Sequence, residues 1–166
     1  GYRNFLFFVN LSNIVQKTKE NFLNSLSSKY LFADEITIDG EKIKIKEVSN
    51  FQYSDDTAIN ICFTTTQGLH SDMWSVKENS LSVDDFANKK VVLISDEAHH
   101  LNADTKKMSK DEEESYKSWE YTVHRIFGAN RDNVLLEFTA TCDIKNPLIK
   151  AEYENKIVFD YPLYKF

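Results

Sequence analysis

Residues 91–100 read VVLISDEAHH, and this stretch decides the fold class. Its first four residues are wholly apolar, which is typical of a short strand covered on both faces, as in the parallel sheets of α/β proteins. The strand ends abruptly in Ser95, Asp96 and Glu97. Ligands of parallel sheets bind beyond the carboxyl ends of the strands, so we expect a functional site at this point.

The remaining chain alternates strand and helix patterns around this stretch, which predicts a mostly parallel α/β sheet. Residues 36–46 are different, because alternating Ile and Lys flank Asp39-Gly40 and predict a β-hairpin beside the main sheet. Asn10 or Ser12 is the expected cap of the first helix, and Gly128 the expected stop of the long helix. The other predicted strands are 4–9, 59–63, 133–138 and 156–161, and the predicted helices are 12–26, 69–74, 82–88 and 109–128.

Composition limits the class of protein. The chain has 166 residues, a 42% apolar share and a formal net charge of -6, which suits one compact domain and argues against a dedicated nucleic-acid coat. No apolar run is long enough for a membrane span, and no signal-type segment opens the chain. Cys62 and Cys142 do not make a disulfide framework, so we expect a cytoplasmic protein.

The acidic pair Asp96-Glu97 has two interpretations. A carboxylate at a strand end can hold hydrated Mg²⁺ on nucleotide phosphates, and the adjacent Glu can accept a proton from attacking water. Acidic residues at strand ends are also common as simple polar termini. The pair alone therefore does not decide between them.

The wider pattern resembles the superfamily 2 helicase ATPases. Residues 96–99 (DEAH) match their motif II, and Thr139-Ala140-Thr141 matches motif III. FLFFVNLSNIVQ resembles motif Ia, although Asn10-Leu11-Ser12 replaces its usual Pro-Thr-Arg, and ICFTTTQGL resembles motif Ib. Within the superfamily, the chain is most similar to the restriction (Res) subunit of type III restriction-modification enzymes, through ISDEAHHLNADTKK, SWEYTVHRI and LLEFTAT.

The resemblance implies an ATP-dependent DNA helicase or translocase with a RecA-like fold. It implies that Asp96 coordinates Mg²⁺, that Glu97 activates water, and that His99 links the nucleotide site to motif III. Thr139, Ala140 and Thr141 would couple that site to a second motor domain. The implied contacts to the DNA backbone are Asn10, Ser12, Thr65 and Thr66. ATP and Mg²⁺ are the implied cofactors, and a methyltransferase (modification) subunit is the implied partner.

The glycine-rich loop that grips phosphate in such motors is not in this sequence, since no Gly precedes a Lys. In the resembled family this loop lies before motif Ia. We therefore expect residues 1–155 to be a partial first motor domain without its phosphate-loop strand, inactive on its own. Residues 156–166 would begin a linker or a second motor domain.

Other functions stay open at this point. The parent could be a superfamily 2 helicase without a nuclease, acting on DNA or RNA, or a non-catalytic scaffold that has lost its phosphate loop. Lys42, Lys44 and Lys46 could form a DNA-binding face, but a solvated hairpin face is the simpler interpretation. Similarly, His99 and His100 lack the spacing of zinc ligands, and the two cysteines are more simply buried thiols than nucleophiles.

Overall fold

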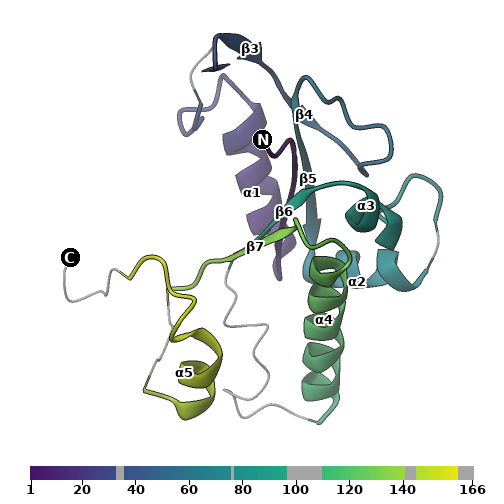
Figure 1. Ribbon diagram of the computed structural model, residues 1–166, viewed down its shortest axis with the longest axis vertical. Helices are drawn as coiled ribbons and strands as arrows, with labels where there is room; N and C mark the ends of the chain where they lie inside the picture. Colours follow the sequence, from purple (N-terminus) through teal and green to yellow (C-terminus); the bar gives the residue numbers. More distant parts are fainter. Residues whose placement is uncertain (33–35, 76, 97–109, 141–144, 161–166) are drawn as a thin grey trace.

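The computed structural model describes residues 1–32, 36–75, 77–96, 110–140 and 145–160 (Figure 1). Its centre is a five-stranded parallel sheet in the order β4-β5-β1-β6-β7. The strands are β1 (Asn4–Val9), β4 (Ile45–Glu47), β5 (Ile59–Thr65), β6 (Val91–Ser95) and β7 (Val134–Glu137). The predicted parallel α/β sheet is confirmed, as a partial RecA-like fold.

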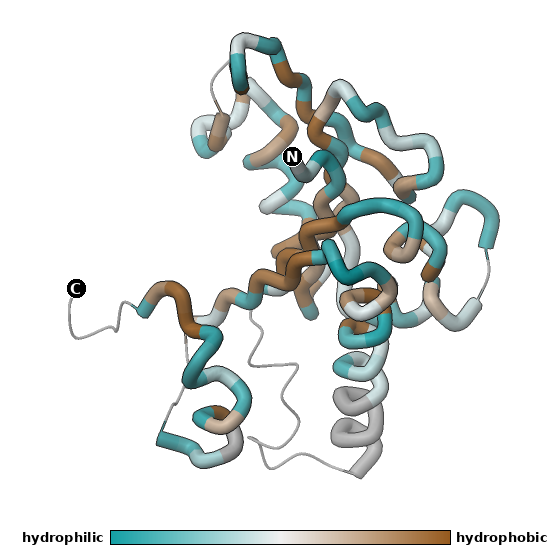
Figure 2. Tube along the Cα trace, in the orientation of Figure 1, coloured by the Kyte–Doolittle hydropathy of each residue, from teal (hydrophilic) through white to brown (hydrophobic). Residues whose placement is uncertain are grey.

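Helices cover both faces of the sheet (Figure 1). On one face lies α1 (Ser12–Leu23), whose Phe22 packs edge-on against Phe63 of β5 with ring centroids 6.0 Å apart. The other face carries α2 (Thr66–Trp74), α3 (Val83–Asn88) and α4 (Lys110–Gly128). Side chains of these three helices form one buried cluster with the strands: Leu6, Phe8, Cys62, Leu69, Met73, Phe86, Val91, Leu93, Val123 and Ile126. Strands covered on both faces explain the continuous apolar runs in the sequence, which appear as the brown centre of Figure 2.

The predicted hairpin exists, but it is shorter than expected. Strands β2 (Ile36–Ile38) and β3 (Glu41–Ile43) pair antiparallel around Asp39 and Gly40, whose φ angles of 53° and 83° fit a primed two-residue turn. The expected second arm through Lys46 is wrong, because the chain leaves the hairpin after Ile43 and β4 joins the main sheet parallel to β5. The three lysines therefore do not share one strand face, and Lys46 pairs with Asp55.

The start of α1 also differs from the prediction. Its N-cap is Leu11, which offers no side-chain acceptor, so neither Asn10 nor Ser12 caps the helix. Ser12 is instead the first helical residue, and Asn10 bonds elsewhere. At the other end, α1 stops at Leu23, which leaves Leu26 of the predicted apolar stripe 94% exposed.

The other predicted helices are confirmed with small changes in their bounds. Asp85 accepts the backbone N–H of Ser82 at 2.8 Å, as the predicted capping box at the start of α3 requires. Gly128 is the last residue of α4 but does not take the left-handed conformation of a glycine stop. Among the residues described, no helix is long and apolar enough to cross a membrane.

The C-terminal part contradicts the prediction of a last strand over residues 156–161. Residues 156–160, the described part of that range, form no strand, and they follow an unforeseen helix, α5 (Pro147–Tyr153). Val158 and Phe159 are 96% and 81% exposed, so the apolar run that suggested a buried strand is not buried here. The apolar run in the sequence suggested a strand, but residues 156–160 have no neighbouring strand to pair with in the described structure.

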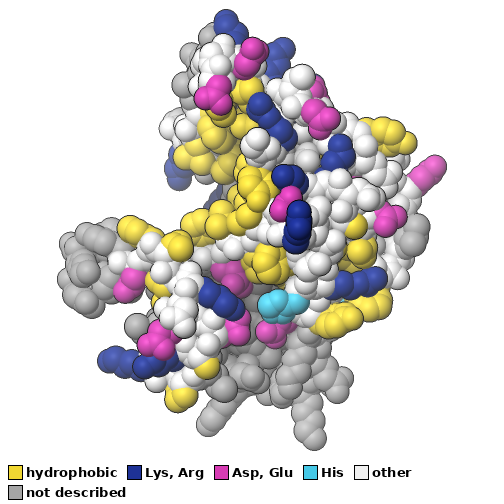
Figure 3. All heavy atoms as spheres, in the orientation of Figure 1, with side chains coloured by type: hydrophobic (Ala, Val, Ile, Leu, Met, Phe, Trp, Pro, Cys, Tyr) yellow, Lys and Arg dark blue, Asp and Glu magenta, His cyan; other side chains and the backbone are white. Residues whose placement is uncertain are grey.

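Strand β7 forms one border of the described sheet, because it pairs with β6 on one side only. Leu136 and Phe138 are 38% and 54% exposed at this border. Figure 3 shows hydrophobic side chains in a row over β7 and the neighbouring C-terminal segment. In the described part of the chain, β7 therefore has no strand neighbour on its other side.

Candidate functional site

Four strand ends meet at the carboxyl edge of the sheet. The parallel register places Phe8 of β1 beside Ser95 of β6, and Ser95 beside Glu137 of β7. On the other side of β1, Val9 lies beside Thr65 of β5. Neighbouring strands are about 4.8 Å apart, so the residues that follow these positions form one continuous row. Asn10, Thr66, Asp96 and Thr139 belong to this row.

Asp96 follows β6 directly, and the backbone holds it on both sides. Its N–H donates to the carbonyl of Phe8 at 3.2 Å, and the Ser95 carbonyl accepts the N–H of Phe138 at 2.8 Å. These bonds continue the ladders one step past the strand ends, so the position of Asp96 is set by both neighbours. The side chain of Asp96 is half-buried. A partly desolvated carboxylate at a fixed position suits a cation that is shared with a phosphate.

Thr139 and Ala140 follow β7 and are exposed at the same edge, one strand from Asp96. The resemblance implied a link between motif II and motif III through His99. Glu97, His99 and Thr141 lie outside the described residues, so the candidate base and the linking histidine stay predictions. Of the candidate residues in motifs II and III, the structure describes Asp96, Thr139 and Ala140.

Thr65 and Thr66 begin α2 with different environments. The Thr65 hydroxyl accepts the N–H of Gly68 at 3.0 Å and so caps the helix, while its O–H hydrogen is still able to donate. Thr66 is only 5% exposed, so its side chain offers little surface to a ligand. Ser12, in contrast, is exposed at the first turn of α1.

Two residues at this edge were missed in the sequence. Gln67 donates from its Nε2 to the Oδ1 of Asn10 at 2.7 Å and joins the loop after β1 to the start of α2. Gly68 fits closely against Thr64, because a Cβ there would lie 2.8 Å from the Thr64 hydroxyl oxygen. No local pattern marks Gln67, since its contact with Asn10 depends on the register between β1 and β5.

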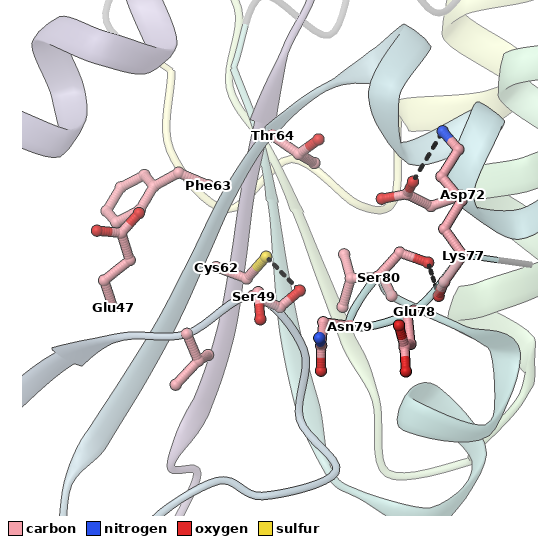
Figure 4. Close-up of a pocket in the computed structure, with 12 residues that line it drawn as sticks. Glu47, Ser49, Cys62, Phe63, Thr64, Asp72, Lys77, Glu78, Asn79 and Ser80 are labelled. Carbon is pink, nitrogen blue, oxygen red and sulfur yellow. Dashed lines mark hydrogen bonds and ion pairs between the residues drawn. The ribbon is translucent and has the colours of Figure 1, made fainter.

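A separate pocket of about 520 Å³ lies over β5, lined by parts of α2 and the loop after it (Figure 4). Glu47, Asp72 and Glu78 give it an acidic character against one Lys77, which pairs with Asp72 at 3.9 Å. Burial raises the pKa of the Asp72 carboxyl, although Lys77 opposes this shift. The phosphates of a nucleoside triphosphate are negatively charged, like the carboxylates of this pocket, so the pocket does not suit them.

The buried thiol of Cys62 points into this pocket toward the Ser49 carbonyl (Figure 4). Burial, and then the nearby carboxylates of Asp72 and Glu47, raise its pKa to about 12. A thiol with this pKa is not a thiolate at neutral pH and is not a nucleophile. The interpretation of Cys62 as a buried structural thiol is confirmed.

The donor set at the carboxyl edge can be tested for its fit to Mg²⁺ and nucleotide. Mg²⁺ bound to nucleotide phosphates takes one or two protein carboxylates and keeps water on its other positions. Asp96 supplies one carboxylate at the correct end of β6. No group of three His, Cys, Asp or Glu side chains that could hold a metal by itself occurs among the described residues. Asp96 at this edge therefore fits a cation that is brought by a phosphate ligand.

The parallel sheet, the helices on both faces and the acidic residue after β6 define a RecA-like α/β domain of the helicase type. A family model described as "Type III restriction enzyme, res subunit" matches residues 1–144. The chain belongs to this family of type III restriction enzyme Res subunits.

A curated relative supports the family. The chain is 37% identical over 184 aligned residues to a protein of Haemophilus influenzae (strain ATCC 51907 / DSM 11121 / KW20 / Rd) named "Probable type III restriction-modification enzyme HindVIP Res subunit". The match covers 100% of this chain and 35% of that protein, so the chain spans about a third of the relative's length. No solved structure matches the chain.

Proposed function

We propose that this chain is part of an ATP-driven DNA translocase within a type III restriction enzyme and that its carboxyl edge carries the ATP and DNA contacts. The observation that carries the proposal is the common edge of β1, β5, β6 and β7, where Asp96 lies within one or two strands of the loops of motifs Ia, Ib and III. In this arrangement, the same row of residues can respond both to the state of the nucleotide and to contact with DNA.

Each residue has a separate part in the proposal. Asp96 would hold Mg²⁺, which when bound neutralises charge on the phosphates. Glu97 would orient the attacking water and accept its proton. His99 would connect this site to Thr139, Ala140 and Thr141, which would couple it to a second motor domain. The phosphate-gripping loop would come from another part of the complete enzyme.

Contact with DNA would use neutral donors. Asn10, Ser12 and Thr65 can offer side-chain N–H or O–H groups, and Thr66 its backbone N–H near the start of α2. Such donors bind phosphate oxygens and read no base sequence. The contact would therefore be independent of sequence, and a methyltransferase subunit would supply the recognition of the target. Such an enzyme would work in the cytoplasm, where the DNA is.

Phosphate release from ATP tests the proposal in a complete Res subunit that contains this chain. Asp96→Asn should abolish most DNA-stimulated hydrolysis, and Glu97→Gln should lower kcat by about 10²–10⁴-fold while ATP still binds. Asp56→Asn is the matched control, because its side chain is 83% exposed and pairs with Lys89 at 3.7 Å. Unchanged hydrolysis in Asp96→Asn would refute the assignment of Asp96, whereas absence of hydrolysis in the unmodified subunit would favour a scaffold role.

The isolated chain provides a second test. With no loop to fix the γ-phosphate in line with water, it should release no phosphate from ATP in the presence of Mg²⁺ and DNA. Turnover that survives purification and disappears in Asp96→Ala would show that the chain contains a complete site after all.

A further inference from the structure

The bond between Gln67 and Asn10 joins two loops that are 57 residues apart in sequence. Asn10 follows β1 and Gln67 is the second residue of α2, and the pairing of Val9 with Thr65 brings them together. The Gln67 Nε2 donates to the Asn10 Oδ1 at 2.7 Å, and the pair is exposed. It lies in the row of residues that we propose to contact DNA.

The start of α2 holds Gln67 in position for this bond. Thr65 caps the helix through the N–H of Gly68, and the Thr64 hydroxyl bonds the Thr65 carbonyl at 3.4 Å. Gly68 packs so closely that a Cβ would lie 3.1 Å from the Thr65 hydroxyl oxygen. These contacts of Thr64, Thr65 and Gly68 fix the backbone at the start of α2, from which the Gln67 side chain projects.

The direction of this bond decides what Asn10 can offer to a ligand. A primary amide has an acceptor oxygen and a donor nitrogen on opposite arms, and phosphate oxygens only accept. When Gln67 occupies the Asn10 oxygen, the two N–H groups of the Asn10 Nδ2 face away from Gln67. We propose that Gln67 is a positioning residue, which orients the Asn10 amide so that it donates to a DNA phosphate.

This inference rests on the proposed DNA contact and assigns its positioning residue. An exposed hydrogen bond between two mobile side chains contributes little to folding, because water replaces it readily. The bond is therefore better suited to orienting the amide than to stabilising the domain. Removing it would return rotational freedom to Asn10, and fixing that freedom again on binding weakens affinity by about 3- to 10-fold.

The test is a double-mutant cycle on the full chain, with fluorescence anisotropy of a short labelled DNA duplex of mixed sequence as the readout. Gln67→Leu should raise Kd by about 3- to 10-fold, and Asn10→Ala at least as much. The double variant should bind like Asn10→Ala alone, because Gln67 acts only through Asn10. Gln67→Glu should bind less well than Gln67→Leu, since a carboxylate turns the Asn10 donors toward itself and repels phosphate.

Gln52→Leu is the control, because Gln52 is exposed in the loop between β4 and β5. The Kd of Gln52→Leu for the DNA should equal that of the unmodified chain. Gln67→Leu and Gln52→Leu should also have the same urea midpoint of unfolding. Wild-type affinity in Gln67→Leu, or additive losses in the double variant, would overturn the inference alone. Absence of DNA binding by the unmodified chain would overturn the proposed DNA contact, and the inference with it.

Discussion

Asn133 should be among the sensitive buried polar residues of the described fold. It is 6% exposed and lies between α4 and β7. Its Oδ1 accepts the N–H of Val91 at 3.0 Å, and its Nδ2 donates to the carbonyls of Phe86 at 3.0 Å and Ile126 at 3.1 Å. One side chain thereby holds the ends of α3 and α4 to the start of β6, the strand that leads to Asp96.

Asn133→Ala should destabilise the chain by about 2–6 kcal/mol. The fully buried N–H of Val91 loses its side-chain partner, which costs about 1–3 kcal/mol, and each of the other two bonds is worth about 0.5–1.5 kcal/mol. Domains of this size are stable by about 5–15 kcal/mol, so the loss is a large fraction of the total. With a urea m-value of about 2 kcal/mol/M, the midpoint should fall by about 1–3 M.

Asn130 provides the matched control in the same connection. It also bonds with both arms of its amide, to the Ala87 carbonyl at 3.1 Å and from the Asp132 N–H at 3.0 Å, but in exposed or partly buried positions. Asn130→Ala should cost about 1 kcal/mol, because water can replace its bonds. Equal urea midpoints for the two variants would refute the argument that burial makes Asn133 critical.

Two further predictions follow from burial and from the border of the sheet. In a Cys142→Ser chain, Cys62 should not react with a thiol reagent at pH 8 until urea unfolds the protein. The reason is that its thiol has a pKa of about 12 and the residue is only 5% exposed. Rapid labelling of the folded chain would contradict the burial. At the border, β7 pairs only with β6 in the described part of the sheet, so the chain should self-associate in sedimentation experiments at rising concentration. Leu136→Lys should reduce this association by placing a charge on the exposed edge, and a monomer at every concentration would show that the edge is protected.

Local patterns predicted the elements whose signals are complete within a few residues. The run before Asp96 identified β6, Ser82 and Asp85 identified the start of α3, and Asp39-Gly40 identified a hairpin turn. Each of these signals reports on contacts between sequence neighbours. The family resemblance implied a link between motif II and motif III, and the pairing of β6 with β7 places Asp96 and Thr139 at one edge, since the carboxyl ends of parallel strands coincide.

Features that depend on distant partners could not be predicted. Strand β4 is three residues long, and only its parallel pairing with β5 makes it a strand. The apolar residues around Val158 resemble a strand, but residues 156–160 have no sheet partner. Asn133 and Gln67 are ordinary amides in the sequence, and their importance comes from partners more than forty positions away.

At the carboxyl edge, Thr65 combines a structural role with a proposed functional one, and the chemistry of its hydroxyl allows the two to be separated. Its oxygen accepts the Gly68 N–H to cap α2, and its hydrogen can still donate to phosphate. Aspartate is at least as good an N-cap and interacts favourably with the positive end of the helix, but an ionised carboxylate has no hydrogen to donate and repels phosphate. Thr65→Asp should therefore keep the urea midpoint and lose DNA binding, whereas Thr65→Val should lower the midpoint by losing the cap. If Thr65→Asp binds DNA as the unmodified chain does, the hydroxyl serves the helix alone.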